Sequence, residues 1–326
     1  MINLTLPSTR LARTPLSRAE LYGASWCLSR HIHGHLAPVH WRLPRSITWV
    51  HGWVPNSEDQ FVRLLAQGAH RNRLNLVATE SDATLLSQNG YESLAVGLPF
   101  VYARSPNPQR LGESILLVPA HSARGMPPTH PSAWLQQMET AFDIRNRYQH
   151  IYILLHQREF VHPEVTAWCQ KTGYGYLLGG HPRDLNSLDR LSQIFNSFET
   201  VYGQEPGSFL PMAALCGARV GVTPFPTHQD DARRALALAR APQIAPMRKA
   251  VAEVASEVFV PPSQAIDWTK NAGEAAGSGN IVDPSSPILR GVFNLRTSIQ
   301  TSVTATIGSF AFGARSWTSV TSRVPR

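Results

Sequence analysis

Three short polar segments in the middle of the chain carry side chains that can bind an anion. Each follows an apolar run and is built from His, Arg, Ser, Glu, Gly and Pro. Imidazole, guanidinium and hydroxyl groups donate hydrogen bonds to phosphate oxygens, and glycine lets the backbone approach a ligand closely. The residues expected at the ligand are His121, Ser122 and Arg124 in the first segment, Gly180, His181, Pro182 and Arg183 in the second, and Glu205, Gly207 and Ser208 in the third.

These segments are expected to lie at one edge of a parallel β-sheet. The apolar runs 114–119 and 150–155 read as buried strands, and helices are expected at about 131–148 and 163–171. Residues 174–222 continue as strand, loop, helix, strand, loop, helix and strand. This alternation predicts a doubly wound α/β domain, whose ligands bind at the carboxyl ends of the strands. Helix N-termini at that edge also favour an anion.

The first third of the chain shows a second, shorter alternation of strands and helices. Its strands are expected at 46–51, 74–78 and 92–96. His51, Gly52 and Trp53 lie where the first of these strands ends. An imidazole at this position can serve as the general base toward the hydroxyl group of a substrate that accepts a transferred group. Gly52 and Trp53 can contact the sugar ring of such an acceptor. The alternative is that His51 and Trp53 only shape the wall of a cleft.

Two acidic residues, Glu80 and Asp82, follow the next strand and offer an alternative general base. Ser81 or Asp82 can instead cap the helix that begins here, because their side chains accept hydrogen bonds from the first helical N–H groups. We favour the capping interpretation.

Four histidines crowd together near the N-terminus, at His31, His33, His35 and His40. Alternating histidines on one face of a strand could hold a metal ion. The stretch 31–40 itself contains no Cys, Asp or Glu, so we favour a polar loop and expect no metal site. The three cysteines of the chain are far apart and lack CxxC spacing, which favours core positions in a reducing compartment.

The composition favours folded domains and an anionic partner. The chain has 326 residues, 43% hydrophobic and 16% charged, with a net charge of +8 that comes mostly from arginine. Guanidinium groups suit phosphates and carboxylates, although a GC-rich genome would also favour arginine. Neither zinc-finger spacing nor a stripe of aromatic and basic residues occurs, so a nucleic-acid partner is not expected. The absence of GxGxxG and GxxxxGK[ST] argues against a standard dinucleotide site and a P-loop.

The sequence carries no signal-peptide pattern and no apolar run of about 20 residues. We therefore expect a cytoplasmic protein. Its C-terminal stretch 288–326 combines aromatic and β-branched residues with arginines as its charged residues. This tail is either a surface-bound amphipathic segment that touches the inner membrane or a small strand appendage, and we favour the membrane or partner role slightly.

At these residues the chain resembles bacterial GT-B glycosyltransferases that build surface polysaccharide such as capsule and lipopolysaccharide. WVHGWVP and LVATESDATLLSQNGYESLAVGLPFVY are similar to their acceptor-side domain. ILLVPAHSARG, GGHPRD and GSFLPMAALCGARVGV are similar to their donor-side domain. The His-Pro pair resembles the motif with which transferases of CMP-sugars hold the donor phosphate. The resemblance covers about residues 45–225 and departs from the family pattern at 203–206 and 218–219.

The resemblance implies an α/β fold of GT-B type, in which two Rossmann-like doubly wound domains face a cleft and a C-terminal extension follows. We expect an acceptor-side domain at 1–104, a donor domain at 105–260, and a flexible linker and tail at 261–326. The implied activity is metal-independent transfer of a sugar, whether hexosyl, sialyl or Kdo, from a nucleotide-sugar to a glycan or glycolipid, without a cofactor. The alternatives are a nucleotide-sugar epimerase of the same fold and a catalytically degenerate GT-B scaffold.

Overall fold

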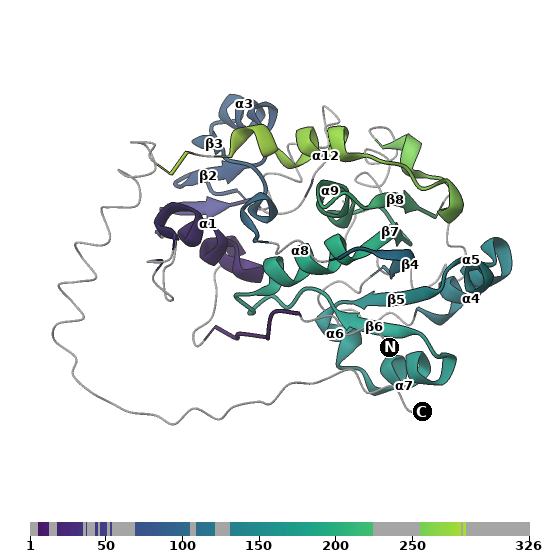
Figure 1. Ribbon diagram of the computed structural model, residues 1–326. Helices are drawn as coiled ribbons and strands as arrows, with labels where there is room; N and C mark the ends of the chain where they lie inside the picture. The colour runs from purple at the N-terminus through teal and green to yellow at the C-terminus, as the bar shows by residue number, and fades with distance from the viewer. Residues whose placement is uncertain are drawn as a thin grey trace, which may run out of the picture.

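The protein contains two parallel β-sheets with helices packed against them (Figure 1). The computed structural model describes residues 6–12, 18–34, 37, 43–44, 46–50, 53, 69–104, 109–120, 131–223, 255–281 and 283–284. The predicted fold class, α/β with two Rossmann-like sheets, is confirmed. The division into domains at residues 104 and 260 stays a prediction.

The larger sheet has five parallel strands in the order β6-β5-β4-β7-β8. Counted from the first strand of this unit, the order is 3-2-1-4-5, which is the Rossmann arrangement. The direction of strand order reverses between β4 and β7, so the crevice for a ligand is expected at the carboxyl ends of these two strands. The strands are β4 (Leu111–Val118), β5 (His150–Leu155), β6 (Gly175–Leu178), β7 (Phe198–Gly203) and β8 (Arg219–Val222).

Helices cover both faces of this sheet. Ile115 and Leu117 pack with Trp134 and Val165 on one face, whereas Leu116 packs on the other face with residues of α8 and α9. Both faces are buried, and this explains why the strands read as continuous apolar runs. The expected helix at 131–148 is broken at Asp143, whose φ is +51°. The helices are α4 (Ser132–Phe142), α5 (Ile144–Arg147), α6 (Gln157–Phe160), α7 (Pro163–Thr172), α8 (Ser187–Ser197) and α9 (Phe209–Leu215).

The smaller sheet has three parallel strands in the order β1-β2-β3. Thr79 caps α3, and its side chain accepts from the N–H of Asp82 while the Asp82 carboxylate accepts from the N–H of Thr79. The capping interpretation is thus confirmed for Asp82, whereas the N-cap itself is Thr79 and not Ser81. The elements are η1 (Arg18–Gly23), α1 (Ala24–His33), β1 (Ile47–Trp49), β2 (Leu74–Val77), α3 (Glu80–Gln88), β3 (Ser93–Ala95) and η3 (Pro99–Tyr102).

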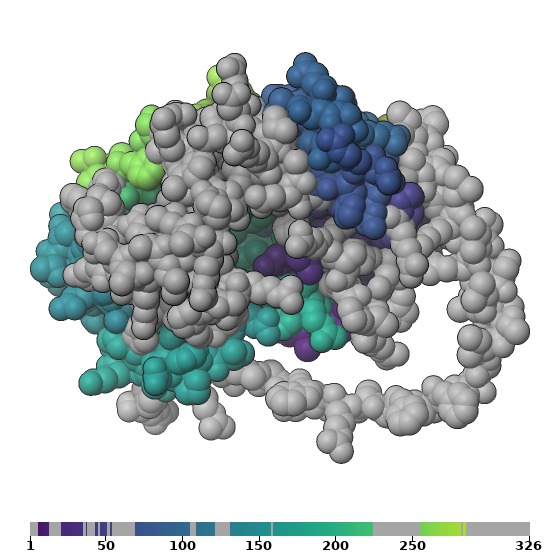
Figure 2. Space-filling model, turned by 180° about the vertical axis from the view of Figure 1, so that it is seen from behind, coloured from purple at the N-terminus to yellow at the C-terminus, as the bar shows by residue number. Residues whose placement is uncertain are grey.

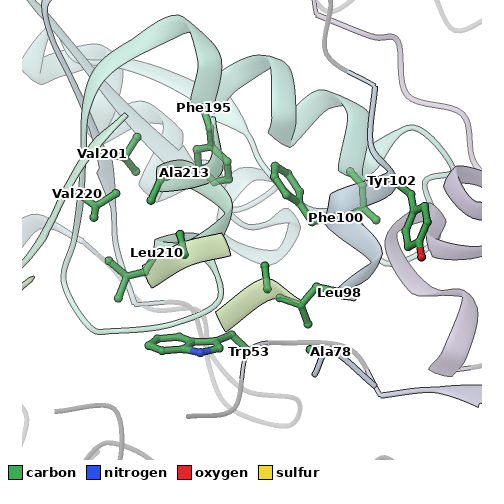
Figure 3. Close-up of a cluster of buried hydrophobic side chains, with 14 of the residues drawn as sticks. Trp53, Ala78, Leu98, Phe100, Tyr102, Phe195, Val201, Leu210, Ala213 and Val220 are labelled. Carbon is green, nitrogen blue, oxygen red and sulfur yellow. The ribbon is translucent and has the colours of Figure 1, made fainter. Parts of the chain in front are cut away.

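One apolar cluster runs from the smaller sheet to the larger one, and α12 (Thr269–Ala276) lies inside it. Figure 3 shows Trp53, Ala78 and Leu98 on one side of this helix and Leu210 on the other. Short 3-10 turns precede and follow α12, namely η5 (Ser256–Val258), η6 (Pro262–Gln264) and η7 (Ser278–Asn280).

The position of α12 corrects the expectation of a flexible linker that starts at residue 261. Trp268, Ala272 and Ala276 are buried, and the N–H of Leu98 donates to the carbonyl of Ala276 at 2.8 Å. The small residues that suggested flexibility instead let α12 pack closely between the sheets. Residues from 285 onward, which include the expected C-terminal tail, lie outside the described residues.

Candidate functional site

A glutamine connects the carboxyl ends of β4 and β7. The N–H of Gln204 donates to the carbonyl of Val118 at 2.9 Å, and its side-chain oxygen accepts from the N–H of Ala120 at 3.0 Å. Gln204 thus joins the two loops at which a ligand of a Rossmann sheet is expected. Gln204 is not among the site residues expected from the sequence. Its position directly after the fourth strand of the unit is the signal that could have identified it.

Trp53 of the smaller unit lies against Ser208 of the larger one. The backbone N–H of Trp53 donates to the Ser208 side-chain oxygen at 2.9 Å. The Trp53 ring is 7% exposed and meets the ring of Trp268 edge to face, with centroids 5.6 Å apart. The structure therefore brings an expected acceptor residue and an expected donor residue together. It also shows that the ring of Trp53 is buried against Trp268, whereas we had expected it to contact a sugar.

The His-Pro segment follows the edge strand β6 and forms a tight turn. The N–H of Arg183 donates to Nδ1 of His181 at 3.0 Å, and the N–H of His181 donates to the Ser187 hydroxyl at 3.0 Å. Burial lowers the pKa of His181, against the opposing effect of the Asp184 carboxylate. A neutral imidazole that accepts at Nδ1 carries its proton on Nε2, so His181 presents an N–H donor.

The N-terminal segment holds this turn in place. The N–H of Ala12 donates to the carbonyl of Arg183 at 2.8 Å, and the Arg183 guanidinium donates to the carbonyl of Ala12 at 3.0 Å. The N–H of Tyr22 donates to the carbonyl of Pro182 at 3.0 Å. In Figure 2, purple atoms of the N-terminal residues lie beside teal-green atoms of the larger unit. The backbone of Pro182 and Arg183 thus supports the N-terminal segment, a role that we did not expect from the sequence.

A buried ion pair anchors the same contact. Asp184 and Arg190 are 0% and 3% exposed, and their charged groups approach to 2.6 Å. The Arg190 Nε also donates to the carbonyl of Pro7 at 3.1 Å. A buried charge pair of this kind is costly to break, because either partner alone would remain as an unpaired buried charge.

The close approach at Gly180 involves a protein side chain, whereas a Cβ on Gly207 would lie 3.9 Å from the Phe209 ring, which is ordinary contact. A Cβ on Gly180 would lie 2.9 Å from the Tyr22 ring, and a Cβ on Gly203 would lie 2.1 Å from the Phe209 ring. The N–H of Leu210 donates to the carbonyl of Gly207, and Ser208 precedes α9, which has only seven residues. Glu205 is half-buried in the same loop. The expected site residues His51, Gly52, His121, Ser122 and Arg124 lie outside the described residues.

Asp82, the three cysteines and His31 lie in capping or packed positions. Burial raises the pKa of Asp82, which serves as a capping residue. Burial also raises the pKa of Cys27, Cys169 and Cys216 to about 12, so these thiols stay protonated at neutral pH. His31 lies on α1 and meets the Tyr102 ring edge to face at 5.0 Å. The described residues contain no group of three or more His, Cys, Asp or Glu side chains that could hold a metal ion.

An open depression lies at the opposite edge of the larger sheet. Arg110, Glu113 and His150 line it at the amino ends of β4 and β5. Ligands of parallel sheets bind at the carboxyl ends, so we do not assign this depression to the site. Within the part of the chain that the structure describes, no helix is long and apolar enough to cross a membrane.

Comparisons with known proteins give weak structural similarities. No protein-family model matches the sequence, and no curated protein matches it. The crystal structure of a GtfA/B complex has a TM-score of 0.35 at 13% identity, covering 76% of this chain and 53% of that chain. The α,α-trehalose 6-phosphate synthase from Burkholderia multivorans has a TM-score of 0.34 at 11% identity, covering 81% and 68%. The spinosyn forosaminyltransferase SpnP has a TM-score of 0.28 at 12% identity, covering 86% and 68%.

This chain therefore spans about half the length of the GtfA/B chain. The assignment of a function therefore depends on the geometry of the chain itself.

Proposed function

We propose that the protein is a GT-B glycosyltransferase that moves a sugar from a nucleotide-sugar donor to a bacterial surface glycan or glycolipid. The observation that carries the proposal is the contact between Trp53 and Ser208. It brings the end of the first strand of the smaller sheet to the carboxyl edge of a sheet with Rossmann strand order. A donor held at that edge would therefore lie next to groups of the acceptor-side unit, as transfer between two substrates requires.

The donor would be held by three loops at the carboxyl edge of the larger sheet. His121, Ser122 and Arg124 follow β4, Gly180–Arg183 follow β6, and Glu205, Gly207 and Ser208 follow β7. The Nε2–H of a neutral His181 and the guanidinium of Arg183 can donate to phosphate oxygens. Such donors stabilise the charge of a departing nucleotide, and we propose that they act without a metal ion or cofactor. His51 is the proposed general base, with Gly52 and Trp53 on the acceptor side.

The test is nucleotide binding followed by donor turnover. Calorimetric titration of the whole chain with UDP, GDP, CMP and CDP should identify one nucleotide that binds. With the matching nucleotide-sugar, His181→Ala and Arg183→Ala should each reduce turnover by at least about tenfold, as expected for the loss of a charge-assisted hydrogen bond. Arg147→Ala is the matched control, because Arg147 is exposed at the end of α5. Unchanged turnover in both loop variants would contradict the proposed donor site.

Two alternatives have distinct outcomes in the same experiments. An epimerase would consume the nucleotide-sugar without an acceptor, so turnover in the absence of acceptor separates it from a transferase. A catalytically degenerate scaffold would bind none of the four nucleotides. The observation that favours a scaffold is the burial of Trp53, which is 7% exposed and whose ring meets the ring of Trp268.

We further propose a cytoplasmic protein whose C-terminal tail contacts the inner membrane. The arginines and aromatic residues of 288–326 support this location, because such segments bind anionic lipid surfaces. Sedimentation with phosphatidylglycerol vesicles should depend on this tail. Equal sedimentation of the full chain and of a chain that ends at residue 284 would contradict the proposal.

A further inference from the structure

Three polar side chains meet at the carboxyl ends of β5 and β6, outside the residues assigned above. His156 directly follows β5, and its Nε2 lies 3.4 Å from the hydroxyl of Tyr22. Its Nδ1 lies 3.7 Å from the carboxylate of Glu159, whose side chain is 4% exposed. These residues come from η1, the end of β5 and α6, so the cluster depends on the tertiary fold.

The backbone at Tyr22 adopts a left-handed conformation. Tyr22 has a φ of +60°, which is rare for a residue with a Cβ. Gly23 has a φ of +85°, and a Cβ at this position would lie 2.1 Å from the carbonyl oxygen of Leu185. The N–H of Tyr22 donates to the carbonyl of Pro182, and its ring lies against Gly180. Backbone strain that the surrounding structure maintains is characteristic of functional sites.

The electrostatics of the cluster orient the tyrosine hydroxyl. With the proton of the His156 ring on Nδ1, on the side of the Glu159 carboxylate, Nε2 can accept a hydrogen bond from the hydroxyl of Tyr22. Burial raises the pKa of Tyr22, which keeps this hydroxyl protonated. A tyrosine oxygen that donates to His156 can still accept a hydrogen bond from a ligand hydroxyl.

The order of strands places this cluster between two of the expected phosphate-binding loops. Strand β5 lies between β4 and β6, and adjacent strands are about 5 Å apart. A nucleotide held by the loop after β4 and the loop after β6 must cross the end of β5, where Tyr22 and His156 lie. The buried carboxylate of Glu159 disfavours a phosphate at this point, whereas a neutral hydroxyl group is compatible with it.

We propose that Tyr22, His156 and Glu159 bind the ribose of the nucleotide donor, with the Tyr22 hydroxyl as the contacting group and the other two as positioning residues. This inference rests on the proposed function, because it assumes that a nucleotide binds at this edge. In Rossmann folds a polar side chain beyond the phosphate loop likewise binds the ribose hydroxyls.

The experiment compares ribonucleotides with their deoxy analogues. The probe is whichever of UDP, GDP, CMP and CDP binds the full chain most tightly, together with its 2′-deoxy and 3′-deoxy forms, each titrated by calorimetry. Wild-type protein should bind the ribonucleotide about 3- to 10-fold more tightly than at least one deoxy form, which corresponds to one hydrogen bond. Tyr22→Phe and His156→Gln should reduce this preference to near unity while binding of that deoxy form stays unchanged. His150→Gln, at the other end of β5, is the matched control and should keep the preference.

Each outcome is informative. If no nucleotide binds wild-type protein, the proposed function fails and the inference fails with it. If a nucleotide binds but wild-type protein shows no preference for ribose, or if Tyr22→Phe keeps that preference, the inference is overturned while the proposed function stands. Unchanged binding of the deoxy form shows that a variant is folded, so a lost preference for ribose then reports on the Tyr22 hydroxyl.

Discussion

The backbone N–H of Trp53 and the side-chain oxygen of Ser208 form a hydrogen bond of 2.9 Å that joins the two sheets. Trp53 follows the first strand of the smaller sheet, and Ser208 precedes α9 of the larger unit. The bond lies next to α12, which packs between the two units. The relative position of the two units therefore depends on polar groups as well as on the shared apolar cluster.

Ser208→Ala should destabilise the protein without changing its core. The substitution leaves the N–H of a Trp53 that is 7% exposed without its acceptor, and a buried unsatisfied donor costs about 1–3 kcal/mol. Chemical denaturation should report this loss. Ser256→Ala is the control, because Ser256 is exposed in η5 and its loss should change stability by less than about 0.5 kcal/mol. Equal stabilities of the two variants would show that the hydrogen bond does not contribute.

Gly277→Ala should be far more damaging than Gly279→Ala. Gly277 has a φ of +64°, and a Cβ there would lie 1.8 Å from the carbonyl oxygen of Ala78. Left-handed backbone costs about 1–2 kcal/mol for a residue with a Cβ, and the overlap adds about 1–3 kcal/mol. Gly279 has nothing within 4 Å of an added Cβ. Thermal unfolding of both variants measures the difference, and similar melting temperatures would contradict the observed packing of η7 on the smaller sheet.

Asp82→Asn should leave the protein equally stable or more stable at neutral pH. Burial raises the pKa of Asp82 in the folded protein. The contribution of Asp82 to stability is therefore fully present below its unfolded-state pKa of about 3.9, and it is lost as the pH rises through its folded-state pKa. An asparagine oxygen can still accept from the N–H of Thr79 but carries no buried charge. Asp82→Ala loses the cap and should cost about 0.5–1 kcal/mol. Denaturation at pH 7 compares the three proteins, and a loss in Asp82→Asn as large as in Asp82→Ala would contradict this account.

The stability of the protein should fall as His181 becomes protonated. Burial lowers the pKa of His181 in the folded protein. The contribution of His181 to stability is therefore fully present above its unfolded-state pKa of about 6.5, and it is lost as the pH falls through its lower folded-state pKa. The pH dependence of unfolding should therefore be weaker in His181→Gln over this window. An NMR titration of the His181 ring measures the folded pKa directly. A value above 6.5 would show that the Asp184 carboxylate outweighs the effect of burial.

Local patterns in the sequence were sufficient for β5 and α7 of the larger unit. The expected strand at 150–155 coincides with β5, and the expected helix at 163–171 differs from α7 by one residue. These elements are specified by apolar runs that both faces of the sheet bury, and by helix signals such as Pro163 at the start and Gly173 at the end. The capping role at Thr79 and Asp82 could likewise be predicted, because the partners of a capping box are three residues apart.

Contacts between distant segments could not be predicted from local patterns. The alanine- and glycine-rich stretch around 271–280 lacks the large apolar residues that mark a core helix, yet α12 is buried because small side chains permit close packing. The contact between Ala12 and Arg183 joins residues that share no sequence pattern.

The sequence alone determined the α/β class, the positions of the strands and the loops that follow them, because each depends on residues near one another in the chain. Only the tertiary structure decided what those loops contact. Pro182 and Arg183 support the N-terminal segment, Ser208 receives Trp53, and Tyr22 reaches His156. Each of these contacts joins segments that are far apart in the sequence, and hydrophobic periodicity does not encode which segments meet.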